Sequence, residues 1–338
     1  MPCLGGAGGL RNEESLAGIL TPNKGGTGAR QWNGSPNNHQ PVHALNAPQI
    51  MPATSTAAPR NVLITGASTG IGAACARMLA GRGWRVFAGV RKMQDGEALM
   101  AGSEGQIIPV ILDVTNREQI KTVVQEVGTQ CGTAGLQGVV NNAGIALAGP
   151  LEFMPMEAFE RQFEINVLGL VTVTQAVMPL IRAGHGRIVL MGSNSGFMCE
   201  PFLAGYGATK HALEAIADSL RIELRPWGID VALIEPGAIK TPIWSKSREA
   251  AEQLFVGMPP ECEKLYATPI TALRKMVEKV PSMAIPPERV AKAVTHALES
   301  RWPRTRYPVG LDSIVGSLLV KIVPDRLLDW VIRKVMGI

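Results

Sequence analysis

A tyrosine and a lysine in the second half of the 338-residue chain have the chemistry and the spacing for proton transfer. Tyr206 and Lys210 lie four residues apart in a helical pattern, so both side chains project from one helix face. A phenol exchanges protons poorly at neutral pH, but an ammonium beside it stabilises the phenolate and lowers its pKa. The two residues are therefore candidates for general acid–base catalysis, although a Tyr and a Lys at this spacing more often form an exposed helical pair.

A glycine-rich turn lies earlier in the chain, between a short apolar run, 62–64, and a helical run through Cys75 and Leu79. It spans 65–72 and reads TGASTGIG. Glycines permit a tight turn and let backbone N–H groups approach a pyrophosphate at a helix N-terminus. Such turns also cap ordinary helices, but the strand, turn and helix order favours a dinucleotide site. Its predicted cofactor contacts are Gly66, Ser68, Thr69, Gly70, Ile71 and Gly72.

The end of the second predicted strand indicates which dinucleotide binds. Dinucleotide folds usually carry an acidic residue here for the ribose hydroxyls of NAD, whereas an arginine accommodates the 2′-phosphate of NADP. This strand ends Gly89-Val90-Arg91-Lys92, with no acid at Val90 and two cations after it. Arg91 therefore predicts that NADP(H) is preferred and that NAD(H) is a secondary cofactor. The other interpretation is a solvated strand end.

The elements that must position these residues alternate along the chain. Apolar runs typical of strands occupy 62–64, 85–88, 107–112, 138–140, 187–191 and 230–234. Helical patterns occupy 95–100, 117–127, 159–181 and 206–224. Short apolar strands that alternate with helices imply a parallel sheet covered on both faces. The sequence predicts a single Rossmann-like, doubly wound α/β fold.

The remaining segments define the predicted domain organisation. Residues 1–58 are rich in Gly, Asn, Pro, Ser and Ala without periodicity, so we expect a disordered N-terminal extension before an NAD(P)-binding catalytic domain, 59–310. Within it, helical pieces at 249–255 and 270–280, separated by prolines, predict a small helical substrate lobe, about 241–285. Pro286 and Pro287 then start a helix through Ala297.

Composition excludes several classes of protein. A formal net charge of +5 without a run of Lys or Arg argues against a nucleic-acid partner. The five cysteines are scattered and odd in number, so we expect no disulfide framework and no metal site. No uninterrupted apolar stretch reaches the roughly 18 residues of a membrane-spanning helix. These features predict an intracellular, cytoplasmic protein.

An amphipathic C-terminal extension, 311–338, follows the domain. Apolar residues recur in pairs four apart from Ile314 to Val335, with a break near Pro324. Basic residues occupy the other faces, at Lys321, Arg326, Arg333 and Lys334. These helices could lie on a membrane surface as a peripheral contact, pack on the domain, or join a partner subunit.

Four motifs in order make the chain resemble the short-chain dehydrogenase/reductase family over about residues 60–310. They are the turn 65–72, the sequence NNAG at 141–144, Ser193 thirteen residues before the sequence YGATK at 206–210, and Pro236-Gly237 after the following strand. The resemblance implies that Tyr206 is the general acid/base and that Ser193 holds the substrate oxygen. Ser195 is a second candidate for that serine, ranked lower because the spacing to Tyr206 fits Ser193 better.

The resemblance also assigns roles around this centre. Lys210 would lower the phenol pKa and bind the nicotinamide ribose, and Asn166 would hold a water in a proton relay. Further cofactor contacts implied by the family pattern are Asp113, Val114, Asn142, Ala143, Gly144, Tyr206, Lys210, Pro236, Gly237 and Thr241. Asp113 could instead cap the following turn, and 142–144 could be a plain strand-ending turn.

We therefore predict an NAD(P)-dependent oxidoreductase that acts on an alcohol or carbonyl group. The family's retinol- and steroid-active branch resembles this chain at 89–92 and in its C-terminal extension, which implies a hydrophobic substrate and, with the family, a homodimer or homotetramer. A non-catalytic nucleotide sensor would normally have lost Tyr206 or Lys210. A sugar-nucleotide epimerase or dehydratase would carry a larger C-terminal domain than the residues after Thr241 provide.

Overall fold

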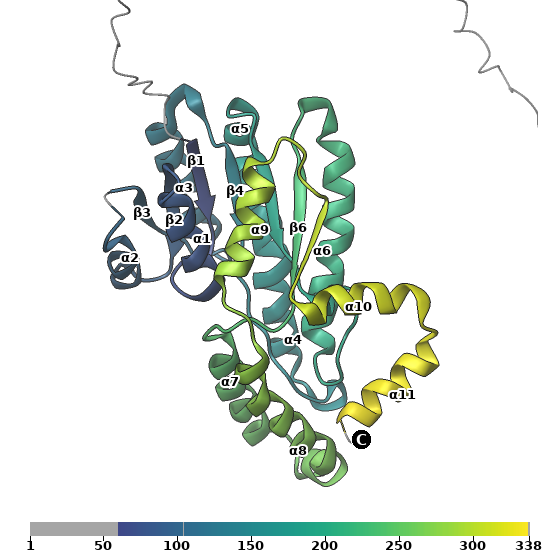
Figure 1. The fold of residues 1–338 in the computed structure, drawn as a ribbon. Coiled ribbons are helices and arrows are strands. Elements are labelled where there is room, and N and C mark those ends of the chain that lie inside the picture. Colours follow the sequence, from purple (N-terminus) through teal and green to yellow (C-terminus); the bar gives the residue numbers. More distant parts are fainter. Residues whose placement is uncertain (1–59, 104, 337–338) are drawn as a thin grey trace, which may run out of the picture. The chain divides into compact units, whose positions relative to one another are not determined.

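The computed structural model describes residues 60–103 and 105–336, so the predicted extension 1–58 lies outside the described residues. They form one seven-stranded parallel sheet in the order β3-β2-β1-β4-β5-β6-β7, with β3 and β7 outermost (Figure 1). The strands are β1 (Arg60–Ile64), β2 (Trp84–Val90), β3 (Ile107–Ile111), β4 (Gly138–Asn141), β5 (Arg187–Met191), β6 (Val231–Pro236) and β7 (Arg306–Val309). The strand order reverses between β1 and β4, which makes this a doubly wound sheet, as predicted.

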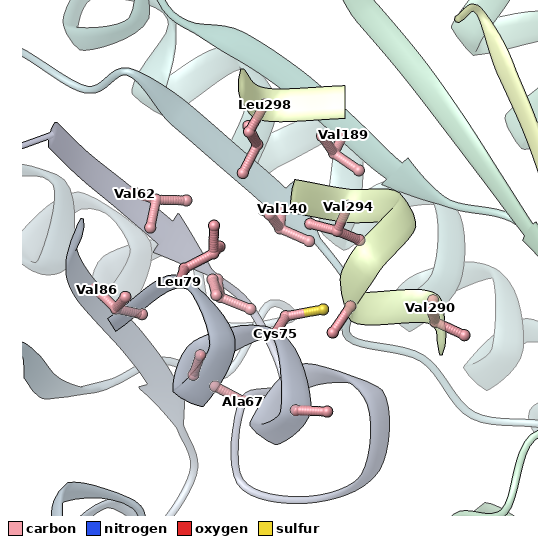
Figure 2. Close-up of a cluster of buried hydrophobic side chains, with 14 of the residues drawn as sticks. Val62, Ala67, Cys75, Leu79, Val86, Val140, Val189, Val290, Val294 and Leu298 are labelled. Carbon is pink, nitrogen blue, oxygen red and sulfur yellow. The ribbon is translucent and has the colours of Figure 1, made fainter. Parts of the chain in front are cut away.

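Helices cover both faces of the sheet and pack on two separate apolar clusters. Their bounds are α1 (Gly70–Ala80), α2 (Met93–Met100), α3 (Arg117–Cys131), α4 (Met156–Phe163), α5 (Leu170–Ala183), α6 (Ala204–Glu223) and α9 (Glu288–Glu299). On one face α1 and α9 lie side by side, and Cys75, Leu79, Val290 and Val294 meet the sheet there (Figure 2). Helices α3, α5 and α6 cover the other face.

One strand of the sheet, β7, was not predicted, and one predicted helix is interrupted. Strand β7 is four residues long and contains Pro308, a residue that usually excludes a strand from a sheet interior. The predicted helix 159–181 contains a π-helical turn, Glu164–Gly169, between α4 and α5. A single inserted turn of this kind leaves the apolar period nearly unchanged, so the pattern could not reveal it.

Among the described residues, one helical stretch, 156–183, is long and apolar enough to cross a membrane. Half of its most apolar window is buried, and Val173, Val177 and Ile181 are completely or almost completely inaccessible in the core. It is therefore a core helix of this domain.

Two further pairs of helices lie outside the sheet layers, one between β6 and α9 and one after β7. Helices α7 (Ile243–Gly257) and α8 (Pro260–Met283) stand where a helical lobe was predicted. The piece predicted at 270–280 is longer than expected, because α8 begins at Pro260 and continues through Pro269. At the C-terminus, α10 (Leu311–Ile322) and α11 (Asp325–Met336) flank Pro324, and α11 returns to contact α8 (Figure 1).

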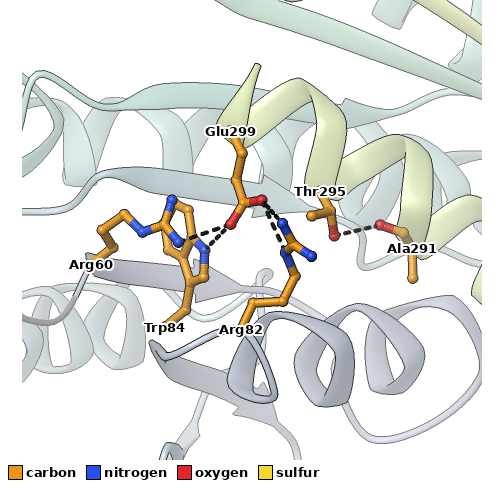
Figure 3. Close-up of polar contacts among 6 residues, drawn as sticks. All are labelled: Arg60, Arg82, Trp84, Ala291, Thr295 and Glu299. Carbon is orange, nitrogen blue, oxygen red and sulfur yellow. Dashed lines mark hydrogen bonds and ion pairs between the residues drawn. The ribbon is translucent and has the colours of Figure 1, made fainter. Parts of the chain in front are cut away.

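A carboxylate at the end of α9 ties this helix to β1 and β2. Glu299 accepts hydrogen bonds from Arg60 and from the indole N–H of Trp84, both at 2.9 Å (Figure 3). Its second oxygen accepts from Nε of Arg82, also at 2.9 Å. The Trp84 side chain is almost fully buried, so its N–H depends on this carboxylate.

Candidate functional site

The glycine-rich turn and the segment after β4 are joined at the carboxyl ends of β1 and β4. The backbone N–H groups of Asn142 and Ala143 both donate to Oγ1 of Thr65 at 3.0 Å. The Asn142 amide in turn donates to the carbonyls of Thr65, at 3.0 Å, and Gly66, at 2.9 Å. Thr65 had no predicted role beyond its place in the motif, yet its hydroxyl holds the two segments together.

The turn needs glycine for close packing and for its backbone angles. Gly66 and Gly70 have positive φ angles of 63° and 59°. A Cβ atom at Gly72 would lie 2.3 Å from the carbonyl oxygen of Gly66, so no side chain fits there. Thr241 also reaches this turn, because a Cβ at Gly70 would lie 3.1 Å from the Thr241 side chain.

The start of α1 has the properties of an anion site. No side chain caps the helix at Thr69, so its first N–H groups have no side-chain acceptor there. A cavity of about 330 Å³ opens beside Ser68, Thr69 and Gly70, and the charged residues Arg77, Lys240 and Glu288 line it. The N–H groups at the helix start and the helix dipole suit the pyrophosphate of a dinucleotide.

Tyr206, Lys210 and Ser193 come together where β5 ends. Tyr206 and Lys210 are on α6, and the Lys210 ammonium lies 5.5 Å from the centre of the phenol ring. Ser193, which follows β5, lies close enough to Tyr206 to lower the pKa of the phenol. The Lys210 ammonium donates to the carbonyl of Met191 at 2.8 Å, and its two other protons remain for ribose hydroxyls.

Burial shifts the pKa values of both Tyr206 and Lys210. Burial raises the pKa of Tyr206 to about 12, and the hydrogen bond with Ser193 opposes this only in part. Burial also lowers the pKa of Lys210 to about 8. Burial is the larger effect on the phenol pKa, and the lowering of that pKa by Lys210 stays a prediction.

The two candidate serines have different partners. The Ser195 hydroxyl donates to the carboxylate of Glu200 at 2.8 Å and is committed there. The Ser193 hydroxyl donates to the side-chain oxygen of Asn194 at 3.0 Å and lies next to Tyr206. Burial raises the pKa of Glu200, and the bond from Ser195 opposes it. Sequence reasoning missed Glu200, since nothing in the sequence places it beside a serine five residues earlier.

Asn166 lies in the π-helical turn and is almost completely buried. Its amide donates to the carbonyl of Ile145 at 2.9 Å and to Thr209 at 3.0 Å, and its oxygen accepts from the Ile145 N–H at 2.8 Å. The Asn166 side chain therefore positions the segment after Gly144 relative to α6. Thr209, three residues after Tyr206, is a partner that its position on the same helix face could have indicated.

Arg91 and Asp113 end the neighbouring strands β2 and β3. Arg91 is exposed and makes no ion pair with another residue in the described part of the chain. Asp113 accepts from the backbone and the hydroxyl of Thr115, at 2.9 and 2.7 Å, so it does cap the following turn. Burial acts to raise the Asp113 pKa, but the Thr115 bonds, with Arg161 and Arg91 nearby, lower it.

Val114, Pro236 and Gly237 complete the predicted set. Val114 is buried in the core and packs on Gly169, so its side chain faces the protein interior. Pro236 is the last residue of β6, and the N–H of Gly237 donates to Val309 of β7 at 2.9 Å.

Known proteins are similar to this chain over the segments described above. Residues 60–252 match a family described as short chain dehydrogenase. An NADPH-dependent 3-dehydrocapnine reductase of Ornithobacterium rhinotracheale is 33% identical, with 81% of this chain and 96% of that protein aligned. Retinol dehydrogenase 7 of Rattus norvegicus is 36% identical, over 80% of this chain and 87% of that protein.

Solved structures agree on the fold. A short chain dehydrogenase from Burkholderia cenocepacia J2315, crystallised with NADP, is 25% identical, with a TM-score of 0.60. The alignment covers 80% of this chain and 95% of that one.

Proposed function

Because the chain belongs to the short-chain dehydrogenase/reductase family, we propose that it transfers a hydride between NADP(H) and an alcohol or carbonyl carbon, with Tyr206 as general acid and base. It is an oxidoreductase of CH–OH or C=O groups. The observation that supports the mechanism best is the grouping of Tyr206, Ser193 and Lys210 at the end of β5, at the same carboxyl edge of the sheet as the glycine-rich turn.

In the direction of reduction, Ser193 donates a hydrogen bond to the substrate oxygen and Tyr206 gives it a proton. Bound NADPH would supply the hydride from nicotinamide C4. A phenol with a raised pKa carries its proton at neutral pH, which is the form that donation requires. Lys210 would bind the nicotinamide ribose with its free N–H groups, while Asn166 keeps the segment after Gly144 in place.

NADP(H) is the preferred cofactor and NAD(H) a secondary one. An NADPH-dependent relative and a structural neighbour bound to NADP support this preference, as does the unpaired Arg91. Asn142, Ala143, Gly144, Asp113 and Thr241 would line the cofactor, with the backbone of Val114, Pro236 and Gly237.

Aromatic side chains near the proposed site suit a lipophilic substrate. The ring of Tyr266, on α8, lies 5.9 Å from Phe153 and 6.1 Å from Phe202, which is four residues before Tyr206. Helices α7 and α8 would be the lobe that encloses this substrate. The retinol dehydrogenase relatives point the same way.

The C-terminal helices would hold the enzyme at a membrane surface. Of α10, only Ser313 and Gly316 are buried, while Leu311, Leu318 and Ile322 are more than half exposed. On α11, Leu327 and Trp330 are also more than half exposed. Exposed cations beside this apolar surface suit anionic lipid headgroups. The alternative is that a second copy of the chain covers the same surface.

Replacing Tyr206 by Phe tests the mechanism. Loss of the proton donor should lower turnover by about 10² to 10⁴-fold. The affinity for NADPH, measured by fluorescence titration, should change little because the ring remains. Turnover close to that of the wild type would contradict the assignment of Tyr206.

Replacing Arg91 by Ala tests the cofactor preference. We expect NADPH to bind about tenfold more weakly, since a charged hydrogen bond to the 2′-phosphate is lost, while NADH binding stays the same. The matched control is Arg85→Ala, which removes a cation near the opposite end of β2. Equal effects of both substitutions on NADPH would show that only net charge matters.

A further inference from the structure

The segment that begins α10 contacts the backbone that ends β6. Gly310 precedes the helix with a φ of 108°, a conformation that suits glycine, and this turn directs the next residues toward 235–238. The following contacts join parts of the chain more than seventy residues apart.

Asp312 makes the central contact. Its carboxylate oxygen Oδ2 accepts the backbone N–H of Ala238 at 2.6 Å. A Cβ atom at Gly237 would lie 2.1 Å from both carboxylate oxygens. The Asp312 carboxylate therefore occupies the space that any side chain at position 237 would need.

Neighbouring residues hold the rest of the same turn. The Ser313 side chain is completely buried, and its hydroxyl donates to the carbonyl of Glu235 at 2.6 Å. The Gly237 N–H donates to Val309. Three backbone groups between Glu235 and Ala238 are thus bonded from the C-terminal side.

The same helix also touches the serine-bearing segment. A Cβ atom at Gly316 would lie 3.3 Å from the ring of Phe197 and 3.5 Å from Met198. The charge of Asp312 contributes to the raised pKa of Glu200, the partner of Ser195, after the larger effect of burial. Helix α10 therefore lies against the segments that follow both β5 and β6.

We propose that Asp312 is a positioning residue that sets the 236–238 turn for cofactor binding, with Ser313 as its support. The inference rests on the proposed function, because the turn continues to Thr241, which lies against the phosphate-binding Gly70. An aspartate in the first turn of α10 is also stabilised by the helix dipole, so the acceptor is held in place before the cofactor arrives.

Hydrogen–deuterium exchange of the free protein tests the contact without turnover. Asp312→Ala should speed exchange of the Ala238 amide by about tenfold, since its acceptor is lost. Asp325→Ala, an exposed acid in the first turn of α11, is the matched control and should change nothing there. An unchanged rate at Ala238 in folded Asp312→Ala would overturn the proposal.

NADPH titration by fluorescence tests the consequence. Asp312→Ala should weaken binding by about tenfold, and Asp312→Asn should stay within about threefold of the wild type because the amide oxygen still accepts. An Asn variant as weak as the Ala variant would contradict positioning by this hydrogen bond. A wild type that binds NADPH but reduces no carbonyl would refute the proposed function. The NADPH affinities of the variants would still test the role of Asp312.

A double substitution separates positioning from general destabilisation. Gly237→Ala should weaken NADPH binding in the wild type, because its methyl group meets the Asp312 carboxylate. In the Asp312→Ala background the same substitution should have a much smaller effect. Additive effects would overturn the proposed contact. If Asp312→Ala does not fold, Ser313→Ala is measured instead. A Ser313→Ala variant with the same amide exchange at 235–238 and the same NADPH affinity as the wild type would count against the proposal.

Discussion

Burial shifts the pKa values of the two residues proposed for proton transfer, Tyr206 and Lys210. The raised pKa of Tyr206, about 12, keeps the phenol protonated, whereas the lowered pKa of Lys210, about 8, lies close to neutrality. The proposed proton donor is therefore in its protonated form at neutral pH.

The pH dependence of carbonyl reduction follows from these values. We expect kcat/KM to be constant below the pKa of Lys210, about 8, and to fall as the pH rises through it, because the ammonium loses its charge. Steady-state kinetics with NADPH in excess measure this, and circular dichroism at each pH checks that the protein stays folded. A reduction rate that increases through this range would contradict the assigned charge states.

The residues that sequence analysis identified have distinctive types at fixed local spacing. Tyr206, Lys210 and Ser193 come together as expected, since one helix and one strand end determine their positions. Asp312 and Glu200 were missed because their partners are set by tertiary contacts. The effect of burial on the pKa of Tyr206 was not anticipated for the same reason, because burial is a property of the whole fold.

The Glu299 contacts show how α9 is attached to the sheet. The Glu299 side chain is 14% exposed, whereas Arg60 and Arg82 are about half exposed. Exposed ion pairs stabilise little, so the bond to the buried indole of Trp84 should account for most of the effect.

Replacing Glu299 by Ala should lower the free energy of unfolding by about 2 kcal/mol, since the indole N–H is left without its acceptor. Urea denaturation measures this. The control is Glu118→Ala, which removes an exposed pair with Lys121 and should cost less than about 0.5 kcal/mol.

At acid pH, the free energies of unfolding of the wild type and Glu299→Ala should become more similar. Burial acts to raise the Glu299 pKa, but the bonds from Arg82 and Trp84 lower it below its ordinary value. The carboxylate therefore stabilises the fold fully when the pH is above the ordinary pKa of a glutamate. This stabilisation is lost as the pH falls through the lowered pKa of Glu299 in the folded protein. A difference that persists in strong acid would contradict the carboxylate as its source.

At the scale of elements, the sequence predicted six of the seven strands and all helices on the two sheet faces. Strongly apolar runs and clear helical periods identify buried elements, and these dominate an α/β sheet. Strand β7 is short and contains a proline, and α8 continues through Pro269. Both depend on packing partners that are distant in the sequence.

For the whole molecule, the exposed C-terminal helices predict binding to lipid. We expect sedimentation with phosphatidylserine vesicles, weakened by salt, and its loss in Leu318→Glu/Trp330→Glu, because both side chains are more than half exposed on α10 and α11. Trp302→Glu is the control, since Trp302 is exposed outside these helices. Size-exclusion chromatography of both variants reveals the alternative, a dimer lost on substitution without any vesicle binding.

The two outermost strands each carry a proline, Pro109 in β3 and Pro308 in β7. Leu112 donates inward to Val90, and Val309 accepts inward from Gly237, so by alternation both prolines occupy outward-facing positions. A proline there has no N–H to offer an incoming chain. Lateral strand addition, the first step of many forms of aggregation, is thus disfavoured at both ends of the sheet. Association of two copies through a shared, continuous sheet is therefore disfavoured at both edges.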